Sequence, residues 1–200
     1  MTTYALKSGF QNLLRPISNA LLGAGVTPNQ VTVATMGASI AMAVVVAVFH
    51  AQGWPYLALP LFFFVRMALN AIDGLMAKEG NLMTPLGAFL NELGDVVSDG
   101  ALFLAFLFDP RVPAPLLLAF VFGAFLTELA GVTAVQVGAR RRYDGPMGKS
   151  DRVILIGALA ILLGFGVADS RVPAAFLGLG LLGTVLTVLN RVRGALGERR

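Results

Sequence analysis

Two sets of polar side chains stand at helical spacing inside an otherwise apolar sequence. Asn70 and Asp73 are three residues apart, and Asn91, Asp95 and Asp99 follow one another at intervals of four. Residues three or four apart lie on the same face of an α-helix, so each set predicts one polar stripe. Carboxylates that face one another repel unless they are protonated or neutralised by cations. Because carboxylate and amide oxygens suit Mg²⁺ or Mn²⁺, the two stripes predict a divalent-metal site.

Small residues beside these stripes would let a phosphate-bearing ligand come close to the backbone. Gly74 directly follows Asp73, and Gly87 precedes Asn91 by about one helical turn. Glycine has no Cβ, so a ligand can approach it closely. The alternative is that the polar side chains only pair with one another across packed helices. The number and the acidity of the clustered residues favour a site for a diphosphate held by a divalent ion.

The elements that must position these residues are membrane helices. Of the 200 residues, 56% are hydrophobic and 13% are charged, whereas soluble globular domains carry about 25% charged residues. This composition argues against a water-soluble globule, and the high apolar content argues against a disordered chain. The absence of cysteine excludes disulfides and thiolate metal sites.

We expect an all-α integral membrane protein with six transmembrane helices preceded by an interfacial amphipathic helix. Residues 4–22 place apolar side chains at helical spacing with polar ones between them, and Pro16 should kink or split that helix. Thr27 or Asn29 can cap the helix that follows. The expected domains are residues 1–26, the interfacial helix, and residues 27–200, the transmembrane domain. The expected spans are Gln30–Phe49, Trp54–Lys78, Pro85–Phe108, Pro115–Gly138, Arg152–Ala168 and Pro173–Leu189.

The positive charges predict the orientation. Of the 15 lysines and arginines, only Arg111 and Arg171 would face the side opposite the termini, and Arg66 would lie within a span. Basic loops mark the cytoplasmic side of membrane proteins, so we expect both termini and the site to be cytoplasmic, in the bacterial inner membrane. The net charge of +4 is explained in the same way. No basic face interleaved with aromatic residues stands out, so no nucleic-acid partner is expected.

The polar residues resemble a known signature. The run Asn70-Ala-Ile-Asp73-Gly74-Leu-Met-Ala77-Lys78 is followed at fixed spacing by Gly87, Asn91 and Asp95. It resembles the signature of the CDP-alcohol phosphotransferases, D-x2-D-G-x2-A-R, eight or nine residues, then G-x3-D-x3-D. Thr27-Pro28-Asn29 is similar to the segment that opens the first span in that family. The resemblance covers nearly the whole chain.

The resemblance implies a membrane enzyme of phospholipid biosynthesis. Such an enzyme transfers a phosphoryl-alcohol (phosphatidyl) group from a CDP-linked donor, most often CDP-diacylglycerol, to the hydroxyl of a small alcohol, and CMP leaves. The resemblance assigns Asp95 as the catalytic base. Glu92 and Asp99, which border or continue the same stripe, are supporting candidates by their position. It assigns one or two Mg²⁺ or Mn²⁺ ions to Asn70, Asp73, Asn91 and Asp95. It assigns the nucleotide to Asp73, Gly74, Ala77, Lys78 and Gly87.

Three positions depart from this signature. Asn70 and Asn91 stand where it has its first and third aspartates, and Lys78 stands where it has arginine. An amide oxygen still ligates Mg²⁺ but brings no charge, and lysine lacks the bidentate fork of arginine. These departures leave open a catalytically weakened relative that binds CDP-lipid or serves as a membrane structural partner. A transporter with intramembrane carboxylates fits less well, because the inverted repeat and paired broken helices often seen in transporters are absent from the pattern.

The segment Gly145–Arg152 combines turn residues with two cations at the opening of the expected fifth span. Helix N-termini favour anions, so we expect Lys149 and Arg152 to face the acceptor alcohol, especially if the acceptor carries a phosphate. In the family that the signature resembles, basic residues near this point contribute to acceptor binding. Glycerol phosphate, an inositol phosphate, serine and other alcohols all stay open as the acceptor.

Two features of the expected fourth span are harder to assign to chemistry. Glu128 is either a site residue or a partner of Arg66. Gly123, Thr127 and Gly131 form a stripe of small residues. Such stripes let helices approach closely, so this one is expected to pack helices within the protomer or in a homodimer.

Overall fold

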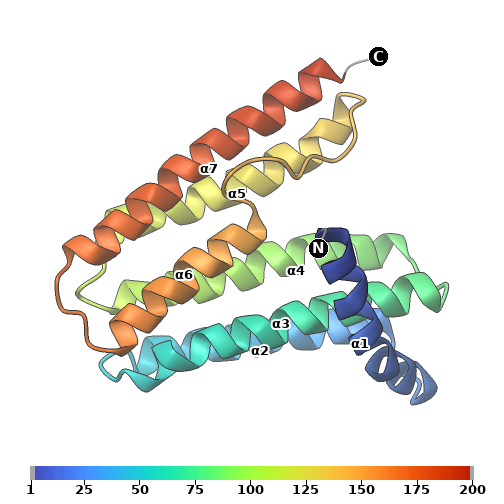
Figure 1. The fold of residues 1–200 in the computed structure, drawn as a ribbon, viewed down its shortest axis with the longest axis horizontal. Helices are drawn as coiled ribbons and strands as arrows, with labels where there is room; N and C mark the ends of the chain where they lie inside the picture. The colour runs from blue at the N-terminus through green and yellow to red at the C-terminus, as the bar shows by residue number, and fades with distance from the viewer. Residues whose placement is uncertain (1–2, 199–200) are drawn as a thin grey trace. The chain divides into compact units, whose positions relative to one another are not determined.

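The computed structural model describes residues 3–198, and the regular structure in that range is helical without a strand. The predicted all-α class is therefore confirmed. Figure 1 shows the helices in chain order. They are α1 (Thr3–Gly23), α2 (Pro28–Val48), α3 (Trp54–Glu79), α4 (Pro85–Leu104), the short 3-10 helix η1 (Ala105–Phe108), α5 (Ala114–Gln136), α6 (Lys149–Gly164) and α7 (Arg171–Gly197).

Within the described range, four helices are long and apolar enough to cross a membrane, namely α2, α3, α5 and α7. Helix α4 has 20 residues but carries Glu92, Asp95 and Asp99, and α6 has only 16 residues. The protein is thus an integral membrane protein. The count of six spans and the interfacial position of α1 stay predictions.

The start of α2 follows from local hydrogen bonding. The hydroxyl of Thr27 accepts a bond from the backbone N–H of Gln30 at 3.3 Å, and the side-chain oxygen of Gln30 accepts one from the N–H of Thr27 at 2.8 Å. This reciprocal pair is a capping box. Pro28 follows at the first helical position, where its missing N–H costs no intrahelical bond. Thr27, rather than Asn29, is therefore the cap.

Of the two predicted effects of Pro16, the split of the first helix does not occur, and the kink stays a prediction. Helix α1 continues from Thr3 to Gly23 with Pro16 inside it. Proline removes one backbone hydrogen bond from a helix, but tertiary packing can outweigh that loss. Here Leu14 is buried against α2 and α3, and Arg15 forms an ion pair of 2.9 Å with Glu79 at the end of α3.

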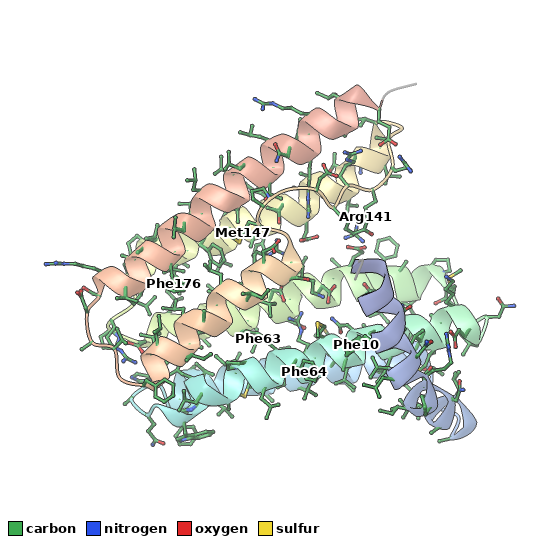
Figure 2. The ribbon with its side chains drawn as sticks, viewed as in Figure 1. Phe10, Phe63, Phe64, Arg141, Met147 and Phe176 are labelled. Carbon is green, nitrogen blue, oxygen red and sulfur yellow. The ribbon has the colours of Figure 1, made fainter. Side chains whose placement is uncertain are left out.

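The chain divides into two compact units, and the first comprises Met1–Met42 and Leu61–Asp99. An apolar cluster holds α1, α2 and α3 together in this unit. Phe10 of α1 also meets Phe64 of α3 edge-on, with 6.2 Å between the ring centroids (Figure 2). The cluster consists of Leu14, Val31, Ile72, Leu75 and Met76.

The second unit comprises Ala43–Pro60 and Gly100–Arg200, and in it α5 and α7 run side by side (Figure 1). Their backbones approach closely at Gly123, where an added Cβ would collide with Thr184 of α7. Gly131 likewise lies against Arg191 of α7. Thr127 between them is fully buried. The predicted stripe of small residues therefore packs helices within one chain.

A buried polar cluster ties three segments of the second unit together. The hydroxyl of Tyr56, near the start of α3, donates to Asp109 at 2.8 Å, and the Arg111 guanidinium donates to the same carboxylate at 2.6 Å. Arg111 also donates to the carbonyls of Leu163 and Val167, each at 3.1 Å, at the end of α6. Burial raises the pKa of Asp109, but the hydrogen bonds from Arg111 and Tyr56 outweigh it and leave this pKa below its usual range.

Candidate active site

A pocket of about 240 Å³ lies in the first unit, where α2, the end of α3 and the start of α4 meet. Small ligand sites are typically concave and carry a few polar groups among apolar ones. The pocket matches that description, because Leu82, Met83 and Ala88 line it together with polar side chains. It also gathers residues that the sequence singled out from two separate helices. These are Asp73, Gly74, Ala77, Gly87, Asn91 and Glu92.

Asp73 is held in a fixed orientation at the pocket. Its side chain is buried, and one carboxylate oxygen accepts a hydrogen bond of 2.7 Å from the hydroxyl of Thr32 in α2. The same hydroxyl lies 3.1 Å from the carbonyl of Pro28. A hydrogen bond to a carboxylate fixes its direction as well as stabilising its charge. Asp73 can therefore present its charge to a ligand in the pocket.

The two glycines of the signature have different surroundings. Around Gly74 nothing lies within 4 Å of the place where a Cβ would stand, so the space beside Asp73 is open. At Gly87 an added Cβ would lie 2.8 Å from the side-chain oxygen of Asn29, closer than real Cβ contacts allow. Glycine at position 87 therefore lets α4 approach the start of α2. Gly87 and Asn29 both line the pocket.

The two predicted polar stripes face each other on α3 and α4. The amide nitrogen of Asn70 donates to Asp95 at 3.0 Å. Arg66, which is buried, lies 3.6 Å from the Asp95 carboxylate and 2.5 Å from that of Asp99. Buried charges in proteins are usually paired in this way. Asn70 and Arg66 thus hold Asp95, while Asp99 forms an ion pair with Arg66.

The oxygen donors at the pocket suit a hard divalent cation. They bring fewer negative charges than the four aspartates of the signature would supply. Among residues 3–198, no three His, Cys, Asp or Glu side chains are arranged to hold a metal ion. The polar lining includes the carboxylates of Asp73 and Glu92, the amides of Asn91 and Asn29, and the hydroxyls of Thr32 and Thr84. Oxygen donors of this kind fit Mg²⁺ or Mn²⁺.

Four predicted site residues of the first unit, Asn70, Lys78, Asp95 and Asp99, lie apart from the pocket lining. Asn70 lies about one turn before Asp73 in α3, Asp95 lies about one turn after Asn91 in α4, and the two side chains bond to each other. Lys78 is exposed in the last turn of α3, where a cation is favourable because the helix dipole is negative there. A positive charge near the last turn of α3 can attract an anionic group in solution.

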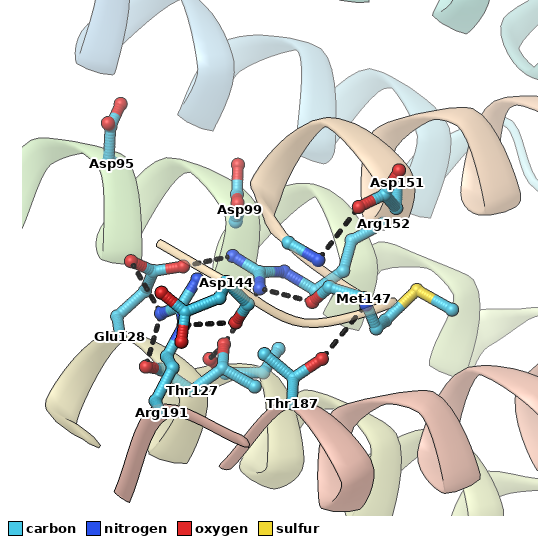
Figure 3. Close-up of polar contacts among 12 residues, drawn as sticks. Asp95, Asp99, Thr127, Glu128, Asp144, Met147, Asp151, Arg152, Thr187 and Arg191 are labelled. Atoms are coloured by element: carbon cyan, nitrogen blue, oxygen red, sulfur yellow. Dashed lines mark hydrogen bonds and ion pairs between the residues drawn. The ribbon is translucent and has the colours of Figure 1, made fainter. Parts of the chain in front are cut away.

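The predicted acceptor residues belong to the second unit. Lys149 is the first residue of α6 and is partly buried. Arg152 is almost completely buried, and its guanidinium donates to Glu128 at 2.7 Å, to the hydroxyl of Thr127 at 2.8 Å and to the carbonyl of Met147 at 3.2 Å (Figure 3). Arg152 therefore forms an ion pair with Glu128 of its own chain.

Glu128 is the partner of several arginines within its own unit. Besides Arg152, it lies 3.6 Å from Arg141 and 3.7 Å from Arg191 (Figure 3). Arg66, the partner considered from the sequence, is paired with Asp95 and Asp99 in the first unit. Helical spacing reveals neighbours only within one helix, so it could not identify partners on α6 and α7.

Sequence reasoning missed the contribution of α2 to the pocket. Asn29 and Thr32 both line it, and Thr32 holds the carboxylate of Asp73. Pro28, which precedes Asn29, lines it as well. The sequence pattern assigns Thr27-Pro28-Asn29 only to the start of a helix. Thr32 lies one turn after Pro28 on the same helix face, and this spacing is the signal that could assign Thr32 to the pocket as well.

The described residues thus form an all-helical membrane protein with a polar pocket in its first unit. The family model for CDP-alcohol phosphatidyltransferase matches residues 25–190. The chain belongs to this family.

Two relatives extend the comparison. The Inner membrane protein YnbA of Escherichia coli strain K12 is 40% identical over 98% of this chain and 97% of its own length. The Phosphatidylinositol phosphate synthase of Mycobacterium tuberculosis strain H37Rv is 29% identical over 93% of this chain and 87% of its own length.

Solved structures share the fold. The crystal structure of the M. tuberculosis phosphatidylinositol phosphate synthase PgsA1 with CDP-DAG bound superposes with a TM-score of 0.78 at 24% identity, over 92% of this chain and 94% of that chain. The same protein in complex with manganese and citrate superposes with a TM-score of 0.76, over 92% and 88% of the two chains.

Proposed function

We propose that the protein is a membrane enzyme that transfers a phosphatidyl group from a CDP-linked donor to the hydroxyl of a small alcohol, with release of CMP, in phospholipid biosynthesis. CDP-diacylglycerol is the donor we favour, since a similar fold has been solved with CDP-DAG bound. The observation that carries the proposal is the pocket, which gathers signature residues from α3 and α4 beside the fixed carboxylate of Asp73.

The chain's own residues divide into a nucleotide side and a transfer side. Gly74 and Ala77 leave room for the CDP moiety against the backbone of α3, and Gly87, which lets α4 approach the start of α2, lines the same nucleotide side of the pocket. Lys78 offers a positive charge to the diphosphate or the nucleotide. Asn70, Asp73, Asn91 and Asp95 would hold one or two Mg²⁺ or Mn²⁺ ions, with Glu92 as a supporting donor. A bound divalent cation supplies charge neutralisation to the diphosphate and to the leaving CMP.

Asp95 is the proposed base. The hydroxyl oxygen of the acceptor attacks the phosphorus that bears the lipid, its proton passes to the Asp95 carboxylate, and the bond to the CMP oxygen breaks. Asn70 donates to one Asp95 oxygen at 3.0 Å and so fixes the direction of the carboxylate. Asp99 supports this arrangement through Arg66, which lies close to both aspartates. Lys149 and Arg152 are the proposed acceptor-side residues.

The test is a reconstituted transfer reaction. Purified protein is incubated with CDP-diacylglycerol, Mg²⁺ or Mn²⁺ and a panel of alcohols, and CMP release is measured. Release that depends on both metal and acceptor supports the proposal. No CMP with any acceptor or metal would instead favour the second candidate, a weakened relative that binds CDP-lipid or serves a structural role. Asn70 and Asn91 are the observation behind that alternative, because they remove two carboxylates from the signature.

We also propose the arrangement in the membrane that the sequence predicts. In it, α4 and α6 join the four long apolar helices to make six spans, and α1 lies in the interface. Residues 1–26 then form a segment separate from the domain 27–200. Both termini and the site face the cytoplasm of a bacterial cell, since the basic loops lie on that side. A homodimer remains part of the proposal, and size-exclusion chromatography with light scattering tests it.

A further inference from the structure

Two neighbouring rows of residues on α4 line the pocket of the first unit. Gly87 and Asn91 form one row, and Ala88 and Glu92 form the other, since residues four apart lie on the same face of a helix. The side chain of Glu92 is partly buried there. The carboxylates that line the pocket are therefore those of Asp73 on α3 and Glu92 on α4.

A carboxylate at position 92 can supply the charge that position 91 lacks. Asn91 and Glu92 are adjacent in the chain, and both line the pocket. The glutamate side chain is one methylene group longer than that of aspartate, so its carboxylate can meet a ligand from a position one residue further along the helix. Mg²⁺ and Mn²⁺ are hard cations that bind carboxylate oxygens well. Glu92 is thus placed to do what an aspartate at position 91 would do.

The other half of the predicted metal site is balanced by a cation of the protein itself. The side chain of Arg66 is 3% exposed, and its guanidinium lies 3.6 Å from the carboxylate of Asp95 and 2.5 Å from that of Asp99. The amide of Asn70 donates to Asp95 at 3.0 Å. A buried positive charge repels another cation, and the repulsion is strong where water is excluded. Arg66 therefore disfavours a divalent ion at Asp95.

We infer that the protein binds one divalent cation rather than two, and that Glu92 replaces the third aspartate of the signature as its charged ligand beside Asp73. The inference rests on the metal site of the proposed function and assigns the ligands of that site. Asp95, held by Asn70 and Arg66, then keeps its carboxylate for the proton of the acceptor hydroxyl. Arg66 provides the positive charge beside Asp95 that a second ion would otherwise provide.

Titration of the purified protein with Mn²⁺ alone tests the inference. We expect one bound ion per chain in the wild type. Glu92→Gln keeps the size of the side chain but removes its charge, so it should weaken binding by about tenfold or more. Glu79→Gln is the matched control, since Glu79 also belongs to the first unit but pairs with Arg15 outside the pocket lining. Two ions per chain, no saturable binding by the wild type, or an unchanged affinity in Glu92→Gln would each overturn the inference.

Moving the carboxylate by one residue gives the sharpest comparison. Glu92→Gln combined with Asn91→Asp keeps the net charge and returns the carboxylate to the position of the third aspartate. If both positions serve the same ion, this double variant should recover most of the wild-type affinity. Glu92→Gln combined with Asn70→Asp restores the same charge beside Arg66 and should stay weak. Equal affinities in the two double variants would overturn the assignment of Glu92.

The metal titration separates failure of the inference from failure of the proposed function. If Mn²⁺ binding depends on Glu92 but no alcohol gives CMP, the transfer reaction is wrong and the inference holds. If CMP is released and Glu92→Gln leaves its dependence on metal concentration unchanged, the proposed function holds and the inference is wrong. Thermal unfolding without metal shows whether each variant is folded. If Glu92→Gln does not fold, Glu92→Ala takes its place in the titration.

Discussion

At the scale of single residues, Asp95 is the residue on which turnover depends most directly. Asp95→Asn keeps the size of the side chain but removes its capacity to accept the hydroxyl proton. We expect CMP release to fall by about 10²–10⁴-fold, the usual contribution of general-base catalysis. Turnover is measured with CDP-diacylglycerol, and thermal unfolding shows whether the variant is folded. Retained activity in a folded Asp95→Asn protein would contradict the assignment.

Asn70 and Asn91, which stand at two aspartate positions of the signature, predict weak metal binding. Asn70→Asp with Asn91→Asp adds two carboxylates to the donor set, so Mg²⁺ or Mn²⁺ should bind more tightly than in the wild type, by about tenfold or more. Isothermal titration with the metal alone measures this without reference to activity. Ser150→Asp, which adds a carboxylate at an exposed position in the other unit, is the control for added charge. An affinity that does not change in the double variant would mean that neither position contacts the metal.

Individual residues also show where sequence reasoning stopped. The spacing of Asn70, Asp73, Asn91 and Asp95 revealed two facing stripes, and the hydrogen bond between Asn70 and Asp95 agrees with that reasoning. Spacing places Thr32 on the same helix face as Pro28, but it does not show the hydrogen bond from Thr32 to Asp73, because these two residues are 41 positions apart in different helices. The same limit applies to Glu128, whose partners come from α6, α7 and a loop.

At the scale of elements, α1 is expected to depend on apolar contact more than on its ion pair. Leu14 is 6% exposed and packs on α2 and α3. The side chains of Arg15 and Glu79 are 46% and 35% exposed. Leu14→Ala should destabilise the protein by about 2–5 kcal/mol, whereas solvent screens an ion pair between exposed side chains, so Arg15→Ala should have little effect. Thermal unfolding of both variants in the same detergent makes the comparison, and a larger loss in Arg15→Ala would reverse the conclusion.

The boundaries of the helices were largely predictable because they follow local signals such as Thr27 and the prolines. The main difference is α7, which runs to Gly197, whereas the sequence predicted an end at Leu189. In the structure Arg191 is buried inside the helix and donates to the carbonyls of Thr127 and Asp144. These carbonyls are distant from Arg191 in the sequence, so a local sequence pattern could not predict that they stabilise the helix beyond Leu189.

At the scale of the whole molecule, the cluster around Asp109 predicts how stability changes with pH. The pKa of Asp109 is lowered in the folded protein, because hydrogen bonds from Arg111 and Tyr56 outweigh its burial. A carboxyl with a lowered folded pKa stabilises the fold above its unfolded pKa, and this contribution is lost as the pH falls through the folded value. Thermal stability should therefore drop below about pH 4. Asp109→Asn should be less stable at neutral pH and should show a weaker drop, and an identical pH profile would contradict this account.

The orientation of the molecule can be tested cleanly because the sequence contains no cysteine. Ser150, beside the basic segment before α6, and Ser170, just before α7, are both exposed. The excess of basic residues on the side of Ser150 predicts that this side is cytoplasmic. In spheroplasts, a membrane-impermeant maleimide should label Ser170→Cys and should label Ser150→Cys only after lysis. The unsubstituted protein is the blank for both. Labelling of Ser150→Cys in intact spheroplasts would invert the proposed orientation, and labelling of both variants there would mean that the two loops are not separated by the membrane.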